Sequence, residues 1–283
     1  MMRRSIYWIT WVLAGMALLP PGNVFAGWET GAKAGFETNV NRSVVDGESD
    51  TYLLGYGAYL RRGDGEHRLD WTFSAMLEGA AYAKADGMDY GSVSLAPGAI
   101  CVVRPGWVIN ISPFLQAKTV RDTDQSSLAF GARADLRQEF REKLYLGEFF
   151  SYIDSRANVD TYSYSEVAAG ALFGVNWTSA TFTEIGYRYS HGDSFLSVGT
   201  VSSSSGGGGG GPGFQGGSSP RFSSTFGNDV VKDLVGTHAV EISAGIDWTR
   251  ALFSVANFAW QATRGDVGTA SSLSGYAGIG YRF

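Results

Sequence analysis

The feature that most constrains the fold is an alternation of apolar and polar side chains that runs without a break over residues 67–84. Leu69 and Trp71 lie on one face of this segment, and Arg68 and Asp70 lie on the other. A period of two residues is typical of a β-strand with one apolar and one polar face. Strands of soluble sheets are usually ~5–6 residues long, whereas a tilted strand that crosses a membrane needs ~9–11 residues. The length of the segment therefore favours a strand of a membrane barrel.

The same alternation recurs along the chain and predicts twelve strands in all. In the second strand we assign Tyr52, Leu54 and Tyr56 to the outer face and Arg61 to the inner face. The seventh and eleventh segments are apolar on both faces, so the pattern leaves their orientation open. In chain order the segments are Trp28–Phe36, Tyr52–Leu60, His67–Lys84, Val93–Cys101, Trp107–Ala117, Leu128–Leu136, Lys143–Asp154, Val167–Trp177, Thr181–Tyr189, Leu234–Trp248, Ala251–Thr263 and Leu273–Phe283.

The connections between these segments alternate in length. Tight turns such as Val103–Gly106 and Thr249–Arg250 alternate with longer loops such as Asn39–Asp50, His191–Asp233 and Arg264–Ser271. Short turns at one end, long loops at the other and an even number of strands are typical of bacterial outer-membrane barrels. We therefore predict an all-β, antiparallel, up-and-down transmembrane barrel of about twelve strands. Its long loops would be extracellular, and its short turns and both termini would lie in the periplasm.

The N-terminal segment has the pattern of an export signal. Arg3 and Arg4 precede an uncharged apolar run, Ile6–Leu19, and Val24–Ala26 resembles the small-residue site at which such signals are cleaved. The apolar run is shorter than the ~20 residues that a membrane-spanning helix requires. We interpret residues 1–26 as a cleaved signal peptide and residues 27–283 as one barrel domain. Within that domain, residues 191–233 are predicted to form a long extracellular loop rich in serine and glycine.

Composition narrows the class of protein further. Of the 283 residues, 39 are glycine and 14% are aromatic, whereas only 17% are charged, against ~25% in a typical globular chain. The formal net charge of −5 argues against a nucleic-acid binder, because such proteins carry a basic patch or a high pI. The single cysteine, Cys101, can form no internal disulfide, and no Cys or His spacing matches a metal site. We predict neither a cofactor nor a bound metal ion.

Five tryptophans fall near the ends of the predicted strands. Trp28, Trp107, Trp177 and Trp248 share the short-turn end, and Trp260 lies at the opposite edge. Amphipathic aromatic rings prefer the level of the lipid headgroups and form girdles at both membrane interfaces. We therefore predict a girdle at which the barrel contacts outer-membrane lipids and lipopolysaccharide.

The chain ends on a strand whose alternate residues are Ala277, Ile279, Tyr281 and Phe283. A terminal Phe after this alternation resembles the C-terminal recognition strand of outer-membrane β-barrel proteins. The resemblance implies that the barrel-assembly machinery reads these four residues during biogenesis. Residues 35–42 also resemble, more faintly, the first barrel strand and loop of surface-lipoprotein assembly modulators, from which only the barrel is carried over.

The polar faces of the strands predict a charged lumen. Charged groups inside a barrel require water or partners of opposite charge, so the lumen is either a narrow watered pore or closed by paired charges. Together with Glu29, Glu37, Glu139 and Arg282, the predicted lining comprises ten acidic and nine basic residues, and no strong ion preference is expected. The predicted pore-lining residues are Lys33, Arg61, Arg68, Asp70, Glu78, Lys84, Lys118, Arg133, Asp135, Arg137, Glu166, Glu184, Arg188, Glu241 and Asp247.

Three functions remain open on these grounds. The leading hypothesis is a small pore or transporter for polar solutes, with no catalytic residues. The second is a structural, interaction or secretion-related barrel that presents its extracellular loops to partners. The third is an outer-membrane lipid hydrolase, for which the outward-facing His238 is the best candidate base, because that chemistry needs a hydroxyl nucleophile within reach of an imidazole.

Overall fold

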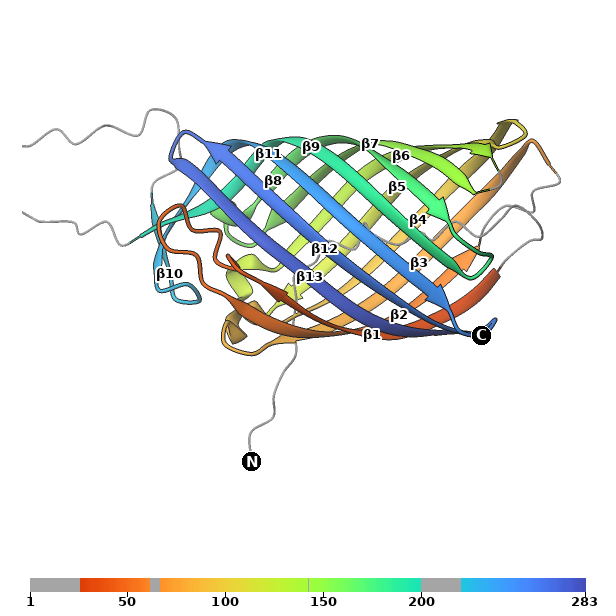
Figure 1. The fold of residues 1–283 in the computed structure, drawn as a ribbon. Helices are drawn as coiled ribbons and strands as arrows, with labels where there is room; N and C mark the ends of the chain where they lie inside the picture. Colours follow the sequence, from red (N-terminus) through yellow and green to blue (C-terminus); the bar gives the residue numbers. More distant parts are fainter. Residues whose placement is uncertain (1–25, 62–66, 142, 200–219) are drawn as a thin grey trace, which may run out of the picture.

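The computed structural model describes residues 26–61, 67–141, 143–199 and 220–283, which form a closed antiparallel β-barrel of twelve strands (Figure 1). The prediction of an all-β, twelve-stranded barrel is thus confirmed. Nearly all of the predicted signal peptide, the connection at residues 62–66 and residues 200–219 of the predicted serine- and glycine-rich loop lie outside the described residues. Within the described ranges, no helix combines the length and the apolarity that a membrane crossing requires.

Each wall strand pairs with its neighbour in the chain, and the pairs β9–β11 and β13–β1 close the ring. Among the described strands, the short strand β10 (Arg221–Ser223) pairs with the outer end of β11 alone and is not part of the wall. The wall strands are β1 (Ala26–Glu37), β2 (Asp50–Arg61), β3 (Leu69–Tyr82), β4 (Tyr90–Arg104), β5 (Trp107–Val120), β6 (Ser127–Arg141), β7 (Leu144–Ala157), β8 (Tyr164–Asn176), β9 (Thr181–Gly199), β11 (Asn228–Asp247), β12 (Leu252–Gly265) and β13 (Gly268–Arg282).

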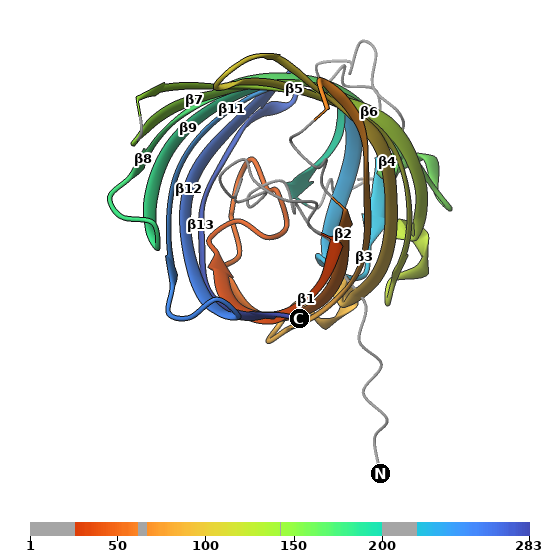
Figure 2. The same cartoon turned by 90° about the vertical axis from the view of Figure 1, so that its right-hand side faces the viewer.

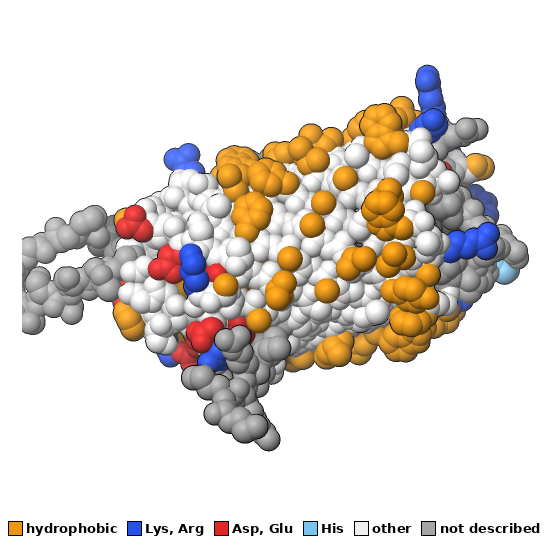
Figure 3. All heavy atoms as spheres, turned by 60° about the horizontal axis from the view of Figure 1, so that its bottom comes forward, with side chains coloured by type: hydrophobic (Ala, Val, Ile, Leu, Met, Phe, Trp, Pro, Cys, Tyr) orange, Lys and Arg blue, Asp and Glu red, His pale blue; other side chains and the backbone are white. Residues whose placement is uncertain are grey.

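The outer surface of the wall is apolar. Alternate residues of β1 switch between exposed and half-buried along its whole length, as expected of a strand with one face outside and one inside. Outward side chains such as Leu53, Leu77, Ile111 and Ile242 are each more than half exposed. In the view of Figure 3, hydrophobic side chains cover the wall and charged ones gather near its two ends.

The predicted orientation of the second strand is wrong. In β2 the outward residues include Thr51 and Leu53, and the side chains of Tyr52, Leu54 and Tyr56 point into the lumen. Both faces of this strand carry large side chains, so its alternation identifies two faces without identifying which one is outside. The neighbouring strand decides the orientation. Gly31 and Gly35 on the inner face of β1 leave space for the rings of their partners, Tyr56 and Tyr52.

Two of the predicted long loops are shorter than expected. Strands β9 and β11 remain paired from Thr181 and Ile246 out to Gly199 and Asp229, so much of the predicted loop 191–233 is strand. The predicted loop Arg264–Ser271 is also mostly strand, since only two residues separate β12 from β13. Backbone pairing continues past the point at which the apolar alternation weakens, because it does not depend on the side chains.

Three successive outer loops lock onto one another and form what we term the collar. Each contains a short 3-10 turn, namely η1 (Asp86–Met88), η2 (Thr123–Gln125) and η3 (Asp160–Tyr162). The Asp122 amide donates to the Gly87 carbonyl at 2.8 Å, and the Asn158 amide donates to the Ser126 carbonyl at 2.9 Å. Backbone hydrogen bonds between loops make this side of the outer rim a continuous structure.

The loop between β1 and β2, residues 38–49, folds inward and is termed here the inner loop. Viewed along the barrel, it lies within the ring of strands (Figure 2). The Asn39 amide group donates to the carbonyls of Ser43 and Ser271, and the Val44 amide donates to the Ser197 carbonyl at 3.0 Å. The inner loop therefore crosses from β1 to β9 over the mouth of the barrel and narrows its outer end.

Candidate functional site in the barrel lumen

Sixteen of the charged residues that the sequence assigns to the lumen lie on inward-facing positions of their strands. Carboxylates outnumber cations among them, so the expected balance of charge is wrong. The ten acidic residues are Glu29, Glu37, Asp70, Glu78, Asp135, Glu139, Glu166, Glu184, Glu241 and Asp247, and the six basic ones are Lys33, Lys118, Arg133, Arg137, Arg188 and Arg282.

The other three predicted lumen residues are placed elsewhere. Arg61 pairs with Ala26 on the outer face, and its guanidinium lies 3.5 Å from the centroid of the Trp71 ring. Arg68 is exposed just before β3 begins. Lys84 is exposed past the end of β3, where its ammonium donates to the Ser49 carbonyl at 3.0 Å. Arg61 was assigned to the lumen because the orientation of β2 was predicted wrongly. Arg68 and Lys84 were assigned to it because β3 was predicted to extend past both of its actual ends.

The ion pairs of the lumen run along the wall. Arg133 pairs with Asp135 at 2.7 Å within β6, and Arg188 pairs with Glu166 on the adjacent strand. Arg282 reaches Asp247 at 2.8 Å, two strands away. Among the described residues, these contacts join positions on the same strand, on neighbouring strands or on next neighbours. The cations are therefore held against the wall by their partners, which leaves the axis of the barrel unbridged by them.

Aromatic rings of the lumen lie flat on glycines of the neighbouring strand. The Tyr145 ring covers Gly174 and the Phe149 ring covers Gly170, and in each pair the two residues are direct cross-strand partners. Ring atoms come within 3.0 Å of the place that a glycine Cβ would occupy, so a larger residue would push the ring off the wall. The same arrangement occurs at Gly31–Tyr56, Gly35–Tyr52, Gly131–Phe114, Gly245–Phe182 and Gly280–Phe253.

Cations stack on several of these rings. The guanidinium carbon of Arg137 lies 4.0 Å from the centroid of the Tyr145 ring, and that of Arg133 lies 4.3 Å from the centroid of the Phe149 ring. Such contacts contribute ~0.5–2 kcal/mol, depending on how far the pair is shielded from water. Glycine, ring and cation thus form layers that keep bulky side chains close to the wall.

These pairs were not among the predictions, although the sequence contains a signal for them. Gly31 and Gly35 are four residues apart, as are their partners Tyr52 and Tyr56. The same spacing of four separates Gly170 from Gly174 and Tyr145 from Phe149. Matched spacings of glycine and aromatic residues in two adjacent strands would have indicated both the pairing and the inward face.

Carboxylates cluster at the short-turn half of the lumen. Glu29, Asp70, Glu139, Glu184 and Asp247 each lie within four residues of the short-turn end of their strands. Each of the five has a partner of opposite charge or a hydroxyl donor, as in the 2.5 Å hydrogen bond from the Tyr145 hydroxyl to Glu184. The negative charge of this half is therefore largely compensated.

The outer half of the lumen contains a cavity of about 260 Å³ beneath the inner loop. Charged side chains that line it include Lys33, Glu37, Arg42, Arg188 and Glu241. Of these, Arg42 belongs to the inner loop and was missed by the sequence analysis, which treated that segment as an ordinary extracellular loop. No group of three His, Cys, Asp or Glu within the described ranges is arranged to hold a metal ion.

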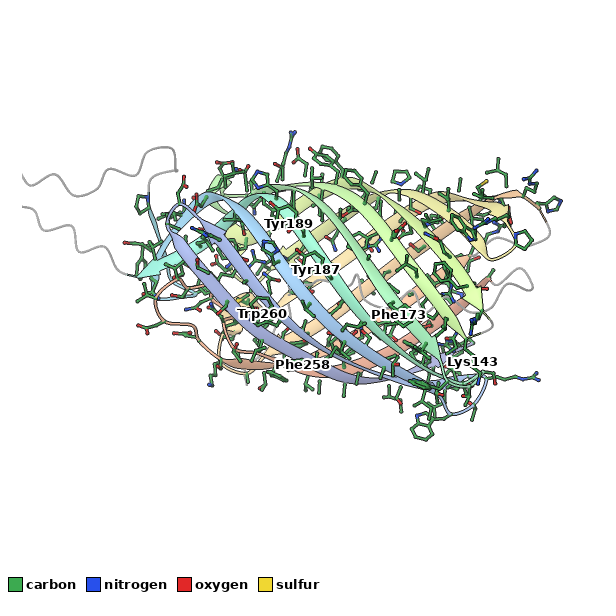
Figure 4. The ribbon with its side chains drawn as sticks, turned by 45° about the horizontal axis from the view of Figure 1, so that its top comes forward. Lys143, Phe173, Tyr187, Tyr189, Phe258 and Trp260 are labelled. Atoms are coloured by element: carbon green, nitrogen blue, oxygen red, sulfur yellow. The ribbon has the colours of Figure 1, made fainter. Side chains whose placement is uncertain are left out.

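Aromatic residues gather on the outer surface near both ends of the wall. Trp28, Trp177 and Trp248 are each about 60% exposed at the short-turn end, and Trp107 is the first residue of β5 at that end. The indole N–H of Trp177 donates to Thr183, and that of Trp248 donates to Ser254, each at 2.9 Å across a turn. The labelled side chains that point outward from β9 and β12 are Tyr189 and Trp260, toward the other end, and Tyr187 and Phe258, nearer the middle of the wall (Figure 4).

His238 lies among these outer aromatic residues. Its Nδ1 shares a 2.7 Å hydrogen bond with the Tyr187 hydroxyl, and the Tyr189 ring centroid is 5.1 Å from the imidazole centroid. The partner of the imidazole is thus a phenol in an aromatic patch. This arrangement contains no feature that favours the lipid-hydrolase hypothesis.

The C-terminal residues Ala277, Ile279, Tyr281 and Phe283 all point outward, and Phe283 is 74% exposed. The Phe283 amide donates to the Trp28 carbonyl at 2.9 Å, which brings the end of the chain beside the start of β1. The final strand therefore closes the ring and presents a row of apolar side chains outside it.

Comparison with known proteins agrees with this architecture. No protein-family model and no curated protein matches the sequence. Among solved structures, an outer-membrane channel from Pseudomonas putida F1 has a TM-score of 0.59 at 10% identity, over 93% of this chain and 98% of that chain. The NanC porin has a TM-score of 0.54 at 8% identity, over 90% of this chain and 100% of that chain. At these identities the likeness shows the fold alone, which is that of a bacterial outer-membrane β-barrel.

Proposed function

We propose that this protein is a channel of the bacterial outer membrane through which small polar solutes cross. The observation that carries the proposal is a lumen lined by charged residues whose ion pairs run along the wall, with a cavity below the inner loop. Charged groups in such a lumen require water unless they are fully paired. The two solved structures with similar folds are described as an outer-membrane channel and a porin, which agrees with this function.

The apolar wall supports insertion into a membrane. A continuous apolar surface of this extent on a soluble monomer would lead to aggregation, whereas an outward apolar band flanked by aromatic girdles suits a bilayer. We propose that the wall contacts outer-membrane lipids and lipopolysaccharide, with the tryptophans of the short-turn end at the periplasmic interface. Both termini would then lie in the periplasm, and residues 1–26 would direct export.

Conductance in planar bilayers tests the channel function. The purified, refolded barrel is expected to produce discrete current steps in salt solution, because ions would pass through the watered lumen. Heat-modifiable migration on gels shows that the barrel is folded. A folded barrel that remains electrically silent would contradict the proposal.

We further propose that the barrel-assembly machinery recognises the C-terminal strand. Deletion of Phe283 is expected to lower the amount of folded barrel in the outer membrane, and Phe283→Tyr is expected to preserve it because the ring is kept. Equal amounts of folded barrel for the deletion and for the wild-type protein would argue against this recognition.

A further inference from the structure

The cavity beneath the inner loop contains unpaired charges of both signs. Six charged side chains line it, and two of them, Arg133 and Arg188, form ion pairs with carboxylates that lie outside the lining. Among the described residues, the other four side chains form no ion pair. They are the cations Lys33 and Arg42 and the carboxylates Glu37 and Glu241. The unpaired charges of the lining therefore cancel, and the cavity offers both positive and negative groups to a solute.

The two carboxylates lie at the two ends of one row of the wall. Glu37 on β1 is the cross-strand partner of Ser274 on β13, and Glu241 on β11 is the partner of Ala259 on β12. Ser274 and Ala259 are in turn partners of each other, which completes the row. At a strand spacing of ~4.8 Å, the backbones of the two glutamates are about 14 Å apart along the wall. Both side chains between them are small and border the cavity, so the row forms a recess with a carboxylate at each end.

Lys33 lies on β1 on the short-turn side of this recess. It precedes Glu37 by four residues, so both side chains point inward, with about 13 Å between their backbones. Its Nζ lies 4.4 Å from the centroid of the Tyr276 ring, and Tyr276 is the partner of Gly35, midway between Lys33 and Glu37. The stem of the lysine lies over Gly278, its own partner. These contacts hold the ammonium along the wall and direct it toward the recess.

Arg42 enters the lining from the inner loop. Its φ angle is 50°, in the left-handed region that residues other than glycine rarely adopt, and such conformations cluster at ligand-binding and catalytic sites. Its guanidinium donates to the Ser194 hydroxyl at 2.7 Å and lies 5.1 Å from the Phe195 ring centroid. The charge of Arg42 acts on the Glu37 carboxylate, although the two groups form no ion pair. The fold thus holds a cation and a carboxylate near each other without direct contact.

The chemistry of the lining suits a solute that carries both charges. Ammonium and guanidinium groups form charge-assisted hydrogen bonds with carboxylate oxygens, and carboxylates form them with ammonium groups. The neutral groups of Asn257, Gln261 and Ser272 also line the cavity and can bind the amide groups of a solute. The cavity volume of about 260 Å³ is below the ~300–1,000 Å³ of pockets that hold drug-sized ligands. The solute is therefore small.

We propose that this cavity binds small zwitterions of the amino-acid and dipeptide class. Lys33 and Arg42 hold the carboxylate of the solute, and Glu37 and Glu241 hold its ammonium group. The proposal rests on the channel function, because it names the class of solute that the channel would pass. A purely anionic or purely cationic solute leaves one of the two sets of groups without a partner.

Calorimetric titration of the detergent-purified barrel tests this site without requiring conduction. The probes are the dipeptide alanylalanine, its N-acetyl form, its C-terminal amide and the form capped at both ends. At about pH 6 the free α-amino group is protonated and the free α-carboxyl group is ionised. The four probes are therefore zwitterionic, anionic, cationic and uncharged on one scaffold. The free dipeptide is expected to bind at least about tenfold more tightly than each of the others, as a charge-assisted hydrogen bond would provide.

Four substitutions link each charge of the solute to its partner. Glu37→Gln and Glu241→Gln are each expected to weaken binding of the free dipeptide about tenfold and to leave that of the N-acetyl form nearly unchanged, because this form lacks the ammonium group. Lys33→Met and Arg42→Asn are expected to weaken the free dipeptide by a similar factor and to leave the amide form nearly unchanged. Asn suits the left-handed backbone at position 42, because it is enriched there.

Two variants outside the lining serve as matched controls. Arg264→Asn removes a cation on the exposed outer face of β12, and Asp266→Asn removes a carboxylate in the exposed turn that follows. Both are expected to leave the binding of all four probes unchanged. Heat-modifiable migration of each variant shows that the barrel remains folded.

The outcomes separate this inference from the channel function. Equal or absent binding of the four probes would overturn the zwitterion site even if the barrel conducts. A preference for the free dipeptide that persists in both Glu37→Gln and Glu241→Gln, or in both Lys33→Met and Arg42→Asn, would overturn it as well. A preference that is lost in at least one variant of each pair would uphold the site, and in an electrically silent barrel the same result would reject the channel.

Discussion

The two halves of the lumen treat charge in opposite ways. In the short-turn half, Glu29 and Asp247 share Arg282, and Glu184 accepts from Tyr145, so that the carboxylates are tied to partners. In the outer half, Lys33 and Arg42 line a cavity without a carboxylate partner in the described part of the chain. The charges of the short-turn half are thus compensated within the chain, whereas these two cations of the outer half have no carboxylate of the described chain within ion-pair distance. The comparison teaches that the total charge of a lumen predicts its behaviour poorly, because the location of the unsatisfied groups decides what it can bind.

The largest effect is expected from disturbing a glycine–aromatic pair in the compensated half. Gly174→Val would drive the Tyr145 ring off the wall, release its hydrogen bond to Glu184 and narrow the lumen. Overpacking of this kind costs ~1–3 kcal/mol, and single-channel conductance should fall severalfold. Gly57→Val is the matched control, because a Cβ at Gly57 meets open space on the outer face. Equal conductance of the two variants would show that the rings do not set the width of the lumen.

A smaller effect is expected from removing the shared cation of the same half. Arg282→Met would leave Glu29 and Asp247 without their common partner, and the side chains of all three are at most 31% exposed. Partial exposure places the loss of stability between that of surface and buried pairs, at about 1–2 kcal/mol. The reversal potential in a salt gradient should shift toward cation selectivity. A shift toward anion selectivity would contradict the account of this half as compensated.

The complementary change in the outer half sharpens the contrast. Glu166→Gln removes the carboxylate that pairs with Arg188, which lines the cavity. Loss of this negative charge makes the outer half of the lumen more positive, so the reversal potential in a salt gradient should shift modestly toward anions. A reversal potential equal to that of the wild-type barrel would contradict a contribution of Glu166 to the charge of the outer half.

The smallest effect concerns the rim above the outer half. Burial raises the pKa of Asp89 above its ordinary value of 3.8, although the Tyr82 amide at 2.9 Å and Arg121 at 3.7 Å favour its ionised form. A raised pKa in the folded state contributes stability at low pH that is lost as the pH rises through that pKa. The urea midpoint of the wild type relative to Asp89→Asn should therefore fall over the pH interval that begins at about pH 4 and passes through the raised pKa of Asp89. A relative midpoint that rises over this interval would exclude the assigned direction.

Much of the wall could be predicted from the sequence, because strands with unlike faces repeat every two residues. The orientation of β2 could not, since Leu53 and Leu54 are equally apolar and only the glycines of β1 select the inner face. The alternation also assigned Lys84 to the lumen because it carries no information about where pairing stops.

The candidate site was less predictable than the wall. Asn39 and Asn41 fold the inner loop that carries Arg42 through hydrogen bonds within the loop, and the Asn39 amide also donates to the distant Ser271 carbonyl, a contact that exists only after the barrel has closed. Lys33 was assigned correctly to the inner face, but its lack of a partner depends on the positions of side chains from several strands. Local periodicity thus predicts the face on which a residue lies. Whether its charge has a partner of opposite sign depends on other strands of the closed barrel.

The glycine–aromatic pairs also have a consequence for how such a barrel diverges in evolution. Because the Phe253 ring occupies the space above Gly280, either residue can change only if the other changes with it. Homologous chains are therefore expected to exchange small and ring-bearing residues in register across neighbouring strands, as coupled substitutions. Such covariation would preserve the internal width of the barrel while the rest of the sequence diverges.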